Sequence, residues 1–151
     1  MGRWIVLIVW WGNCLRGKNR WIRTALFICY CLFIVWYTIL KRSPGTPRAD
    51  LRFMWSYRDL VAGKSTAKAD VIQNTNNILF FIPFGFLIPA KKWWVVIVSA
   101  SAFSILVESV QYIGGYGLAE LDDVICNTLW AMAGYGLWKC VKRVGKDATS
   151  T

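Results

Sequence analysis

Two long apolar stretches constrain the fold of this chain more than any other feature of its sequence. Residues 24–40 contain no charged side chain and are flanked on both sides by basic residues. Residues 93–113 are equally apolar, with Glu108 as their one charged side chain. A helix that crosses the hydrocarbon core of a bilayer needs about 20 mostly apolar residues, and at least about 17. Both stretches satisfy this length, so the sequence predicts an integral membrane protein.

Two shorter stretches reach spanning length only together with polar neighbours. Residues 78–90 are too short alone, so we expect the preceding Asn74, Asn76 and Asn77 to enter the membrane with them. Residues 121–138 span only if Asp122, Asp123 and Asn127 lie at the start of the helix. We therefore predict an all-α integral membrane bundle of four transmembrane helices, formed by residues 24–138.

The composition excludes several classes of function. Of 151 residues, 56% are hydrophobic and 17% charged, which is too little charge to cover a soluble domain of this size. The net charge of +10 comes from basic residues that flank the apolar stretches, a pattern that suits anionic lipids better than nucleic acid. There is no His, so His-metal sites and Ser-His-Asp triads are not available. The five Cys include no CxxC pair, and we expect no metal and no cofactor.

The chain ends are predicted to lie in the cytoplasm. With both termini inside, 11 Lys and Arg lie on the inner side and 7 on the outer side, which agrees with the positive-inside rule. The apolar residues 4–11 are too short to cross, and we interpret residues 1–23 as an interfacial and basic segment, with a signal-peptide core as the alternative. Residues 139–151 form a basic cytoplasmic tail in this interpretation.

Polar side chains form a stripe on the third predicted helix. Ser101, Ser104, Glu108 and Gln111 are separated by 3, 4 and 3 residues, a spacing that places them on one helical face. A carboxylate in the bilayer core costs several kcal/mol, so such a residue faces the protein interior and is paired or protonated. We therefore expect Glu108 to point toward the neighbouring helices.

The fourth predicted helix begins with a second polar face. This face continues through the small residues Ala131 and Gly134, which allow close approach of another helix. Asp122 points about 100° away from this face, so we rank it below Asp123 as a candidate site residue. With Asn77 and the stripe of the third helix, these residues meet at one depth in the outer leaflet. The acids and amide that share the face are Glu120, Asp123 and Asn127.

Three motifs in order resemble the VanZ-like family. They are NNILFFIPFG at residues 76–85, ESVQ at 108–111 and ELDDVICNT at 120–128, the last followed by Gly134. The segment RADLRF at residues 48–53 is similar to an Arg-containing element that the family places after its first helix. The resemblance implies a protein of the bacterial cell membrane that is linked to resistance against teicoplanin-type glycopeptides, and it implies no reaction.

The sequence departs from the family pattern in the turn before the fourth helix. Some members carry an Arg there, whereas this chain has Gly117 and Leu118. If that Arg pairs with the acids in those members, a loop residue such as Arg48 has to take its place here.

Three functions are open at this stage. The first is a non-enzymatic protein that binds a lipid headgroup, a cell-wall precursor or a lipoglycopeptide drug in an outer-leaflet pocket. The second is an intramembrane enzyme with Glu108 and Asp123 as an acid/base pair on a lipid-linked substrate, aided by a divalent cation. The third is a purely structural bundle that scaffolds a partner through the inner basic face or the Trp-rich N-terminus, with the polar residues only holding helices together. For the binding function, the predicted ligand-binding residues are Arg48, Asn77, Glu108, Gln111, Glu120, Asp123 and Asn127.

Overall fold

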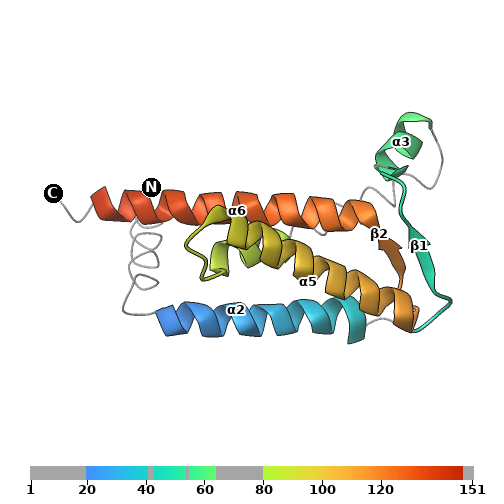
Figure 1. The fold of residues 1–151 in the computed structure, drawn as a ribbon, viewed down its shortest axis with the longest axis horizontal. Helices are drawn as coiled ribbons and strands as arrows, with labels where there is room; N and C mark the ends of the chain where they lie inside the picture. Colours follow the sequence, from blue (N-terminus) through green and yellow to red (C-terminus); the bar gives the residue numbers. More distant parts are fainter. Residues whose placement is uncertain (1–19, 41–42, 54, 64–79, 148–151) are drawn as a thin grey trace.

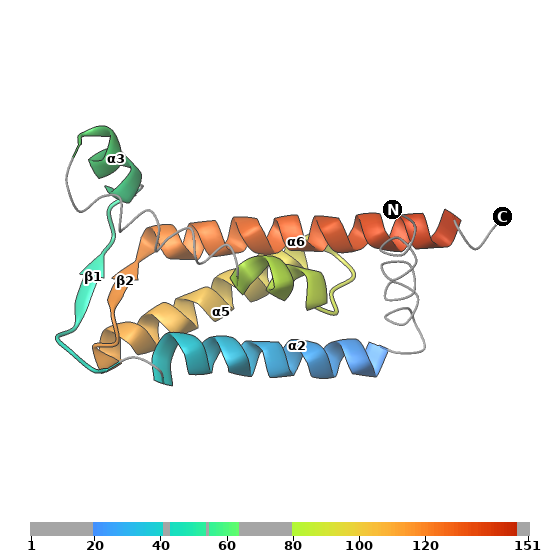
Figure 2. The same ribbon diagram turned by 180° about the vertical axis from the view of Figure 1, so that it is seen from behind.

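The computed structural model describes residues 20–40, 43–53, 55–63 and 80–147, and these are mostly helical. Helix α2 lies roughly along one side of the molecule and α6 along the other, with α5 crossing between them (Figures 1 and 2). Residues 80–87 form a short helical segment among the three long helices. The elements are α2 (Arg20–Val35), η2 (Trp36–Leu40), β1 (Arg48–Asp50), α3 (Trp55–Val61), α5 (Trp93–Gly114), β2 (Leu118–Glu120) and α6 (Leu121–Asp147).

Two helices of the described residues are long and apolar enough to cross a bilayer. They are Trp21–Leu40, which combines α2 and η2, and Trp93–Gly114, which is α5. Both agree with the two long stretches predicted from the sequence. Of the predicted second span, the structure describes the helical residues 80–87, and the expected interfacial segment at residues 4–11 lies outside the described residues. Helix α6 continues beyond the predicted end at residue 138, as far as Asp147.

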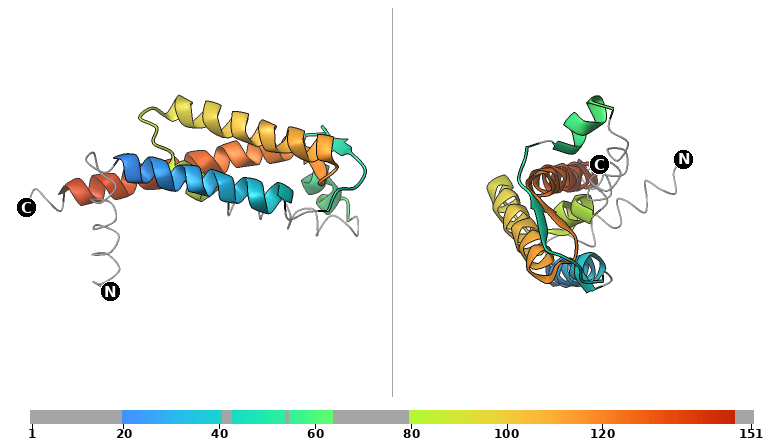
Figure 3. Two further views of the ribbon diagram at one scale, coloured as in Figure 1. Left: turned by 90° about the horizontal axis from the view of Figure 1, so that it is seen from below. Right: turned by 90° about the vertical axis from the view of Figure 1, so that its right-hand side faces the viewer.

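The two ends of the bundle differ in what they contain. At one end lie η2, the end of α5, the start of α6 and both strands, and we call this the strand end (Figures 1 and 3). Toward the other end lie the start of α2, the Lys91–Lys92 connection and the last turns of α6, and we call this the basic end. The Tyr135 hydroxyl donates to the carbonyl of Lys91 over 2.9 Å, which holds that connection against α6.

Aromatic rings fill the middle of the bundle. Phe84 is fully buried and stacks on Phe103 of α5 with ring centroids 5.3 Å apart. The same ring meets Phe27 of α2 edge-on at 4.9 Å. The helical segment 80–87 therefore contributes the central ring that joins α2 to α5.

Glycines set the distance between the segment 80–87 and α6. A Cβ at Gly134 would lie 2.0 Å from the carbonyl oxygen of Ile82, and one at Gly85 would lie 1.8 Å from that of Ala131. Both distances are far below van der Waals contact, so the backbones touch directly. The structure confirms that Ala131 and Gly134 allow close helix approach, and it identifies the segment 80–87 as the partner.

Arg23 links three helical elements at the basic end. Its guanidinium donates to the carbonyls of Phe86 (3.1 Å), Leu87 (3.0 Å) and Ile88. It also stacks over the Trp138 ring of α6, 4.0 Å from the centroid. The sequence placed Arg23 among flanking basic residues, but its side chain is only 7% exposed. The last carbonyls of a helix lack donors within the helix, and here the Arg23 guanidinium supplies these donors.

A short parallel strand pair closes the strand end. Arg48 is in register with Leu118, Ala49 with Ala119 and Asp50 with Glu120. The pairing starts from a backbone contact in which Gly45 N–H donates to the carbonyl of Gly115 over 2.8 Å. Gly115 adopts φ 66°, and a Cβ there would lie 2.1 Å from the Gly45 oxygen. The all-α prediction missed this pair, which fixes Glu120 at the start of α6.

Candidate functional site

The polar stripe of α5 faces the interior, as the spacing predicted. Ser104, Glu108 and Gln111 are buried, and Ser101 is half-buried. They share this face with the buried apolar residues Val96, Ala100 and Val107. The stripe therefore continues the packing surface of α5 into a polar region at the strand end.

Two hydrogen bonds join α5 to α6 along this stripe. The Asn127 amide nitrogen donates to the Ser104 hydroxyl over 2.9 Å. One turn nearer the basic end, the hydroxyls of Ser101 and Thr128 are 2.9 Å apart. The predicted faces of the third and fourth helices thus lie against each other.

Glu108 and Glu120 meet where α5 approaches β2. The Glu120 backbone N–H donates to Glu108 Oε2 over 3.1 Å. Glu108 is 9% exposed and Glu120 5% exposed, so both carboxylates are close to fully buried. Because β2 carries Glu120, the strand pair positions this residue beside α5 rather than leaving it in an open turn.

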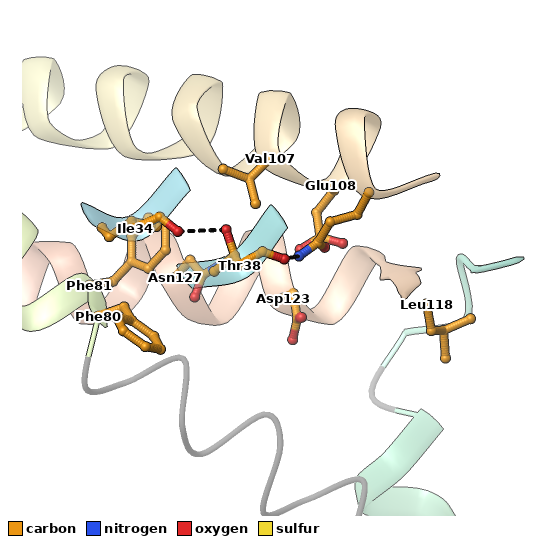
Figure 4. Close-up of a pocket in the computed structure, with 10 residues that line it drawn as sticks. Ile34, Thr38, Phe80, Phe81, Val107, Glu108, Leu118, Asp123 and Asn127 are labelled. Carbon is orange, nitrogen blue, oxygen red and sulfur yellow. Dashed lines mark hydrogen bonds between the residues drawn. The ribbon is translucent and has the colours of Figure 1, made fainter. Parts of the chain in front are cut away.

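Gln111 reaches the end of α2. Its amide nitrogen donates to the Thr38 carbonyl over 3.2 Å. The Thr38 hydroxyl in turn donates to the carbonyl of Ile34, one turn earlier in the helix, over 2.7 Å (Figure 4). Thr38 lies in η2, where the helix has π geometry. Such wide turns free backbone carbonyls and occur frequently at functional sites. The first predicted helix thereby joins the site, a contribution that the sequence did not predict.

Polar side chains of α5, α6 and η2 line one small cavity between these elements. Its volume of about 30 Å³ has room for about one or two water molecules. The Asn127 side chain is 4% exposed, and its Oδ1 accepts no hydrogen bond from the described residues. An unsatisfied buried acceptor costs about 1–3 kcal/mol, so this oxygen is poised to accept from a donor that enters the cavity. The polar residues in the lining are Thr38, Glu108, Gln111, Asp123 and Asn127.

A larger groove lies on another side of Glu108. We call it the lateral groove, and its volume of about 450 Å³ falls in the range of small-ligand sites. Glu108 lines both the cavity and this groove, so the two spaces share one carboxylate. The lateral groove is lined by Ala49, Leu51, Ile105, Glu108, Ser109, Tyr112, Ala119, Glu120, Leu121 and Val124.

The described residues contain no group of three or more His, Cys, Asp or Glu side chains arranged to hold a metal ion.

A family model described as VanZ/LLP1 matches residues 27–142. The chain belongs to the VanZ/LLP1 family. It is 26% identical over 118 residues to Protein VanZ of Enterococcus faecium, an alignment that covers 76% of this chain and 71% of that relative. No solved structure matches the chain.

Membership of the VanZ/LLP1 family agrees with the resemblance predicted from the motifs, all of which lie inside the matched region. ESVQ supplies Glu108 and Gln111, and ELDDVICNT supplies Asp123 and Asn127, which are the polar motif side chains that line the cavity. NNILFFIPFG supplies the apolar lining residues Phe80 and Phe81. Together with the two apolar helices, the family indicates a membrane protein.

Of the predicted site residues that the structure describes, Arg48 and Glu120 do not line the cavity, and Glu120 lines the lateral groove instead. Asn77 lies outside the described residues. Arg48 is exposed on β1, and no ion pair within the described ranges joins it to the acids of α6. Two residues beyond the end of this strand, Arg52 forms a salt bridge with Asp50. Hydrogen bonds from Arg52 lower the pKa of the half-buried Asp50 carboxyl.

Asp122 and Thr38 are the residues that sequence reasoning undervalued. Asp122 was ranked below its neighbours because of its direction on the helix, yet it is 2% exposed. Thr38 acts through its backbone carbonyl, and a carbonyl leaves no signal in the sequence.

Proposed function

We propose that this VanZ/LLP1 family member is a multi-pass protein of the bacterial cell membrane that contributes to resistance against teicoplanin-type glycopeptides. In this proposal, four helices span the bilayer, both termini are cytoplasmic and the strand end faces outward. The ligand is amphiphilic, either a membrane lipid headgroup, a cell-wall precursor or the lipoglycopeptide itself, and it is bound rather than converted.

The arrangement of the bundle supports this topology. The connections predicted to be external, residues 41–77 and 114–120, start or end at the strand end. The predicted internal Lys91–Lys92 connection and the basic last turns of α6 lie toward the opposite end. Lys and Arg favour the cytoplasmic side, so the strand end is the outer one in this proposal.

The convergence of polar side chains on one cavity carries the functional proposal. Glu108, Asp123 and Asn127 come from two helices and meet between chain segments that are otherwise apolar. A bundle stabilised by a closed hydrogen-bond network has every buried polar atom paired, whereas Asn127 Oδ1 has no partner in the described part of this one. That acceptor is therefore the observation that favours a binding role over a purely structural one.

The chemistry of the lining favours a ligand with donors. Carboxylates accept hydrogen bonds, and so does the unpaired Asn127 oxygen. Arg48, which the sequence analysis expected to pair with the acids, does not line the cavity. We therefore expect the bound group to carry N–H or O–H donors, and we expect it to approach Glu108 from the lateral groove because the cavity itself has little room.

Drug susceptibility tests the proposal. We expect cells of a susceptible host that express the chain to tolerate more teicoplanin than cells with empty vector. The isosteric Asp123→Asn variant removes the charge but keeps the shape, and it should lose most of this protection. Asp59→Asn, an acid of α3 outside the cavity, is the matched control and should keep it. Equal susceptibility of all strains at equal membrane abundance would reject the proposal.

A further inference from the structure

Three exposed lysines gather at the basic end around one buried tyrosine. Tyr135 of α6 is 5% exposed, and its hydroxyl donates to the carbonyl of Lys91 over 2.9 Å. The Nζ atom of Lys139, one turn later in α6, lies over the same ring, 5.1 Å from its centroid. Lys91, Lys92 and Lys139 are all exposed. Tyr135 therefore brings the connection before α5 together with the face of α6 that carries Lys139, and we call the three lysines the lysine site.

The sequence provides almost no acid that could neutralise the lysine site. Residues 1–49, 71–107 and 124–146 contain no Asp or Glu. Asp147, at the end of α6, is four residues after Arg143, a spacing at which two side chains on a helix interact. We therefore leave Arg143 out of the site. In the part of the chain that the structure describes, no carboxylate forms an ion pair with any of the three lysines.

Aromatic rings position two of the ammonium groups without cancelling their charge. Besides Lys139 over Tyr135, the Nζ atom of Lys92 lies 6.0 Å from the centroid of the Trp94 ring. A ring attracts a cation through its quadrupole but has no net charge. The ammonium groups therefore keep their positive charge and their N–H donors, which is the chemistry that an anion requires.

We propose that the basic end binds the headgroup of an anionic membrane lipid, whose phosphate is held by Lys91, Lys92 and Lys139. This inference goes beyond the proposed function, because it assigns a second binding site at the end of the bundle away from the cavity.

The surroundings of the lysine site identify a bilayer lipid as the source of the phosphate. Trp93 and Trp94 follow the connection directly, and they are 60% and 50% exposed at the start of a helix that is apolar enough to cross a membrane. Exposed Trp favours the level of the lipid headgroups. On α6, the exposed Leu137 is close to Lys139 in sequence. A lipid can thus place its acyl chains on apolar surface and its phosphate at the lysines.

The net charge of the headgroup determines which lipid is selected. A choline headgroup adds a cation to the phosphate, and the lysines repel that cation. A glycerol headgroup leaves the negative charge of the phosphate uncompensated. Each Lys or Arg beside anionic headgroups strengthens binding about fivefold. The lysine site should therefore prefer the anionic lipid, although both lipids carry a phosphate.

Native mass spectrometry of the purified full chain tests this inference. The protein is loaded from micelles that contain phosphatidylglycerol or phosphatidylcholine with identical acyl chains. We expect phosphatidylglycerol to be retained about tenfold more than phosphatidylcholine, and we expect Lys139→Gln to lower this preference about fivefold. The triple variant Lys91→Gln, Lys92→Gln and Lys139→Gln should abolish the preference. Excess inorganic phosphate should not displace the lipid, because it has no acyl chains.

Two further variants separate a built site from diffuse positive charge. Tyr135→Phe removes the hydroxyl that holds the Lys91 carbonyl and changes no charge, so the preference should fall as it does in Lys139→Gln. Arg58→Gln is the matched control. It removes one positive charge from an exposed position of α3 at the strand end, and it should keep the full preference.

Equal retention of the two lipids, displacement by inorganic phosphate, or a preference that survives Tyr135→Phe or the triple variant would overturn the inference. In each case, teicoplanin protection that still depends on Asp123 leaves the proposed function standing. A failure of the lysine site is therefore distinguishable from a failure of the cavity.

Discussion

The two ends of this bundle bury charged side chains in opposite ways. At the basic end, Arg23 is held by three carbonyls and the Trp138 ring. At the strand end, Glu108 and Asp123 line a cavity beside an Asn127 oxygen that has no partner among the described residues. At the basic end the buried charge is surrounded by its partners, whereas at the strand end the buried acids lie beside an open space.

This difference shows how to separate structural from functional polar groups in an apolar bundle. A buried charge with every partner in place contributes to folding, and its removal leaves other groups unpaired. A buried group with an unused acceptor and adjacent space contributes to binding. The comparison predicts large stability effects at the basic end and small ones at the strand end.

The largest effect is expected at Arg23. Arg23→Met replaces the guanidinium by the end of an unbranched apolar side chain. This leaves the carbonyls of Phe86, Leu87 and Ile88 without their donor. The free energy of unfolding should fall by about 2–4 kcal/mol, since each unsatisfied buried group costs about 1–3 kcal/mol. Thermal unfolding in detergent measures this. Arg143→Met, at an exposed position of α6, should change little, and equal effects of the two substitutions would contradict the closed arrangement.

The next effect concerns the contact between α6 and the segment 80–87. Gly134→Ala introduces a Cβ 2.0 Å from the Ile82 oxygen, and we expect it to destabilise the fold by about 1–3 kcal/mol. Gly136→Ala, two residues further on the same helix, meets no atom within 4 Å. It should be neutral or stabilising by up to about 1 kcal/mol, because Ala favours the helix over Gly. Opposite signs in the same unfolding assay are the expected result.

At the strand end we expect function to change more than stability. In Glu108→Gln the remaining amide oxygen can still accept from the Glu120 N–H, so the unfolding free energy should change by less than about 1 kcal/mol. Teicoplanin protection should nevertheless fall strongly. A loss of stability as large as that of Arg23→Met would show that the acids serve folding instead.

The smallest effect concerns the ion pair between Asp50, at the end of β1, and the exposed Arg52 that follows it. Hydrogen bonds from Arg52 lower the pKa of Asp50 below its ordinary value of 3.8. Whatever stability this pair adds is therefore present above pH 3.8 and is lost as the pH falls through the lowered pKa. An NMR titration of the carboxyl should show an upward shift of the pKa in Arg52→Gln. An unchanged pKa would exclude the pair as its cause.

Periodicity predicted the helices and most of the cavity. The spacing of Ser104, Glu108 and Gln111 placed them on one face, and the small face around Gly134 predicted a close helix contact. Features that depend on backbone groups were missed, because the strand pair, the contact of Gln111 with the Thr38 carbonyl and the carbonyl partners of Arg23 form between segments far apart in sequence. Residue types alone do not encode such contacts.

A double-substitution cycle tests most directly whether Glu108 and Asp123 serve one ligand. The measurement is the teicoplanin concentration tolerated by cells that express Glu108→Gln, Asp123→Asn or both at equal membrane abundance. Two groups that hold the same ligand act as a unit, so each single variant should lose most of the protection and the double variant little more. Full protection in all three strains, or single losses that add up in the double variant, would contradict a shared binding site.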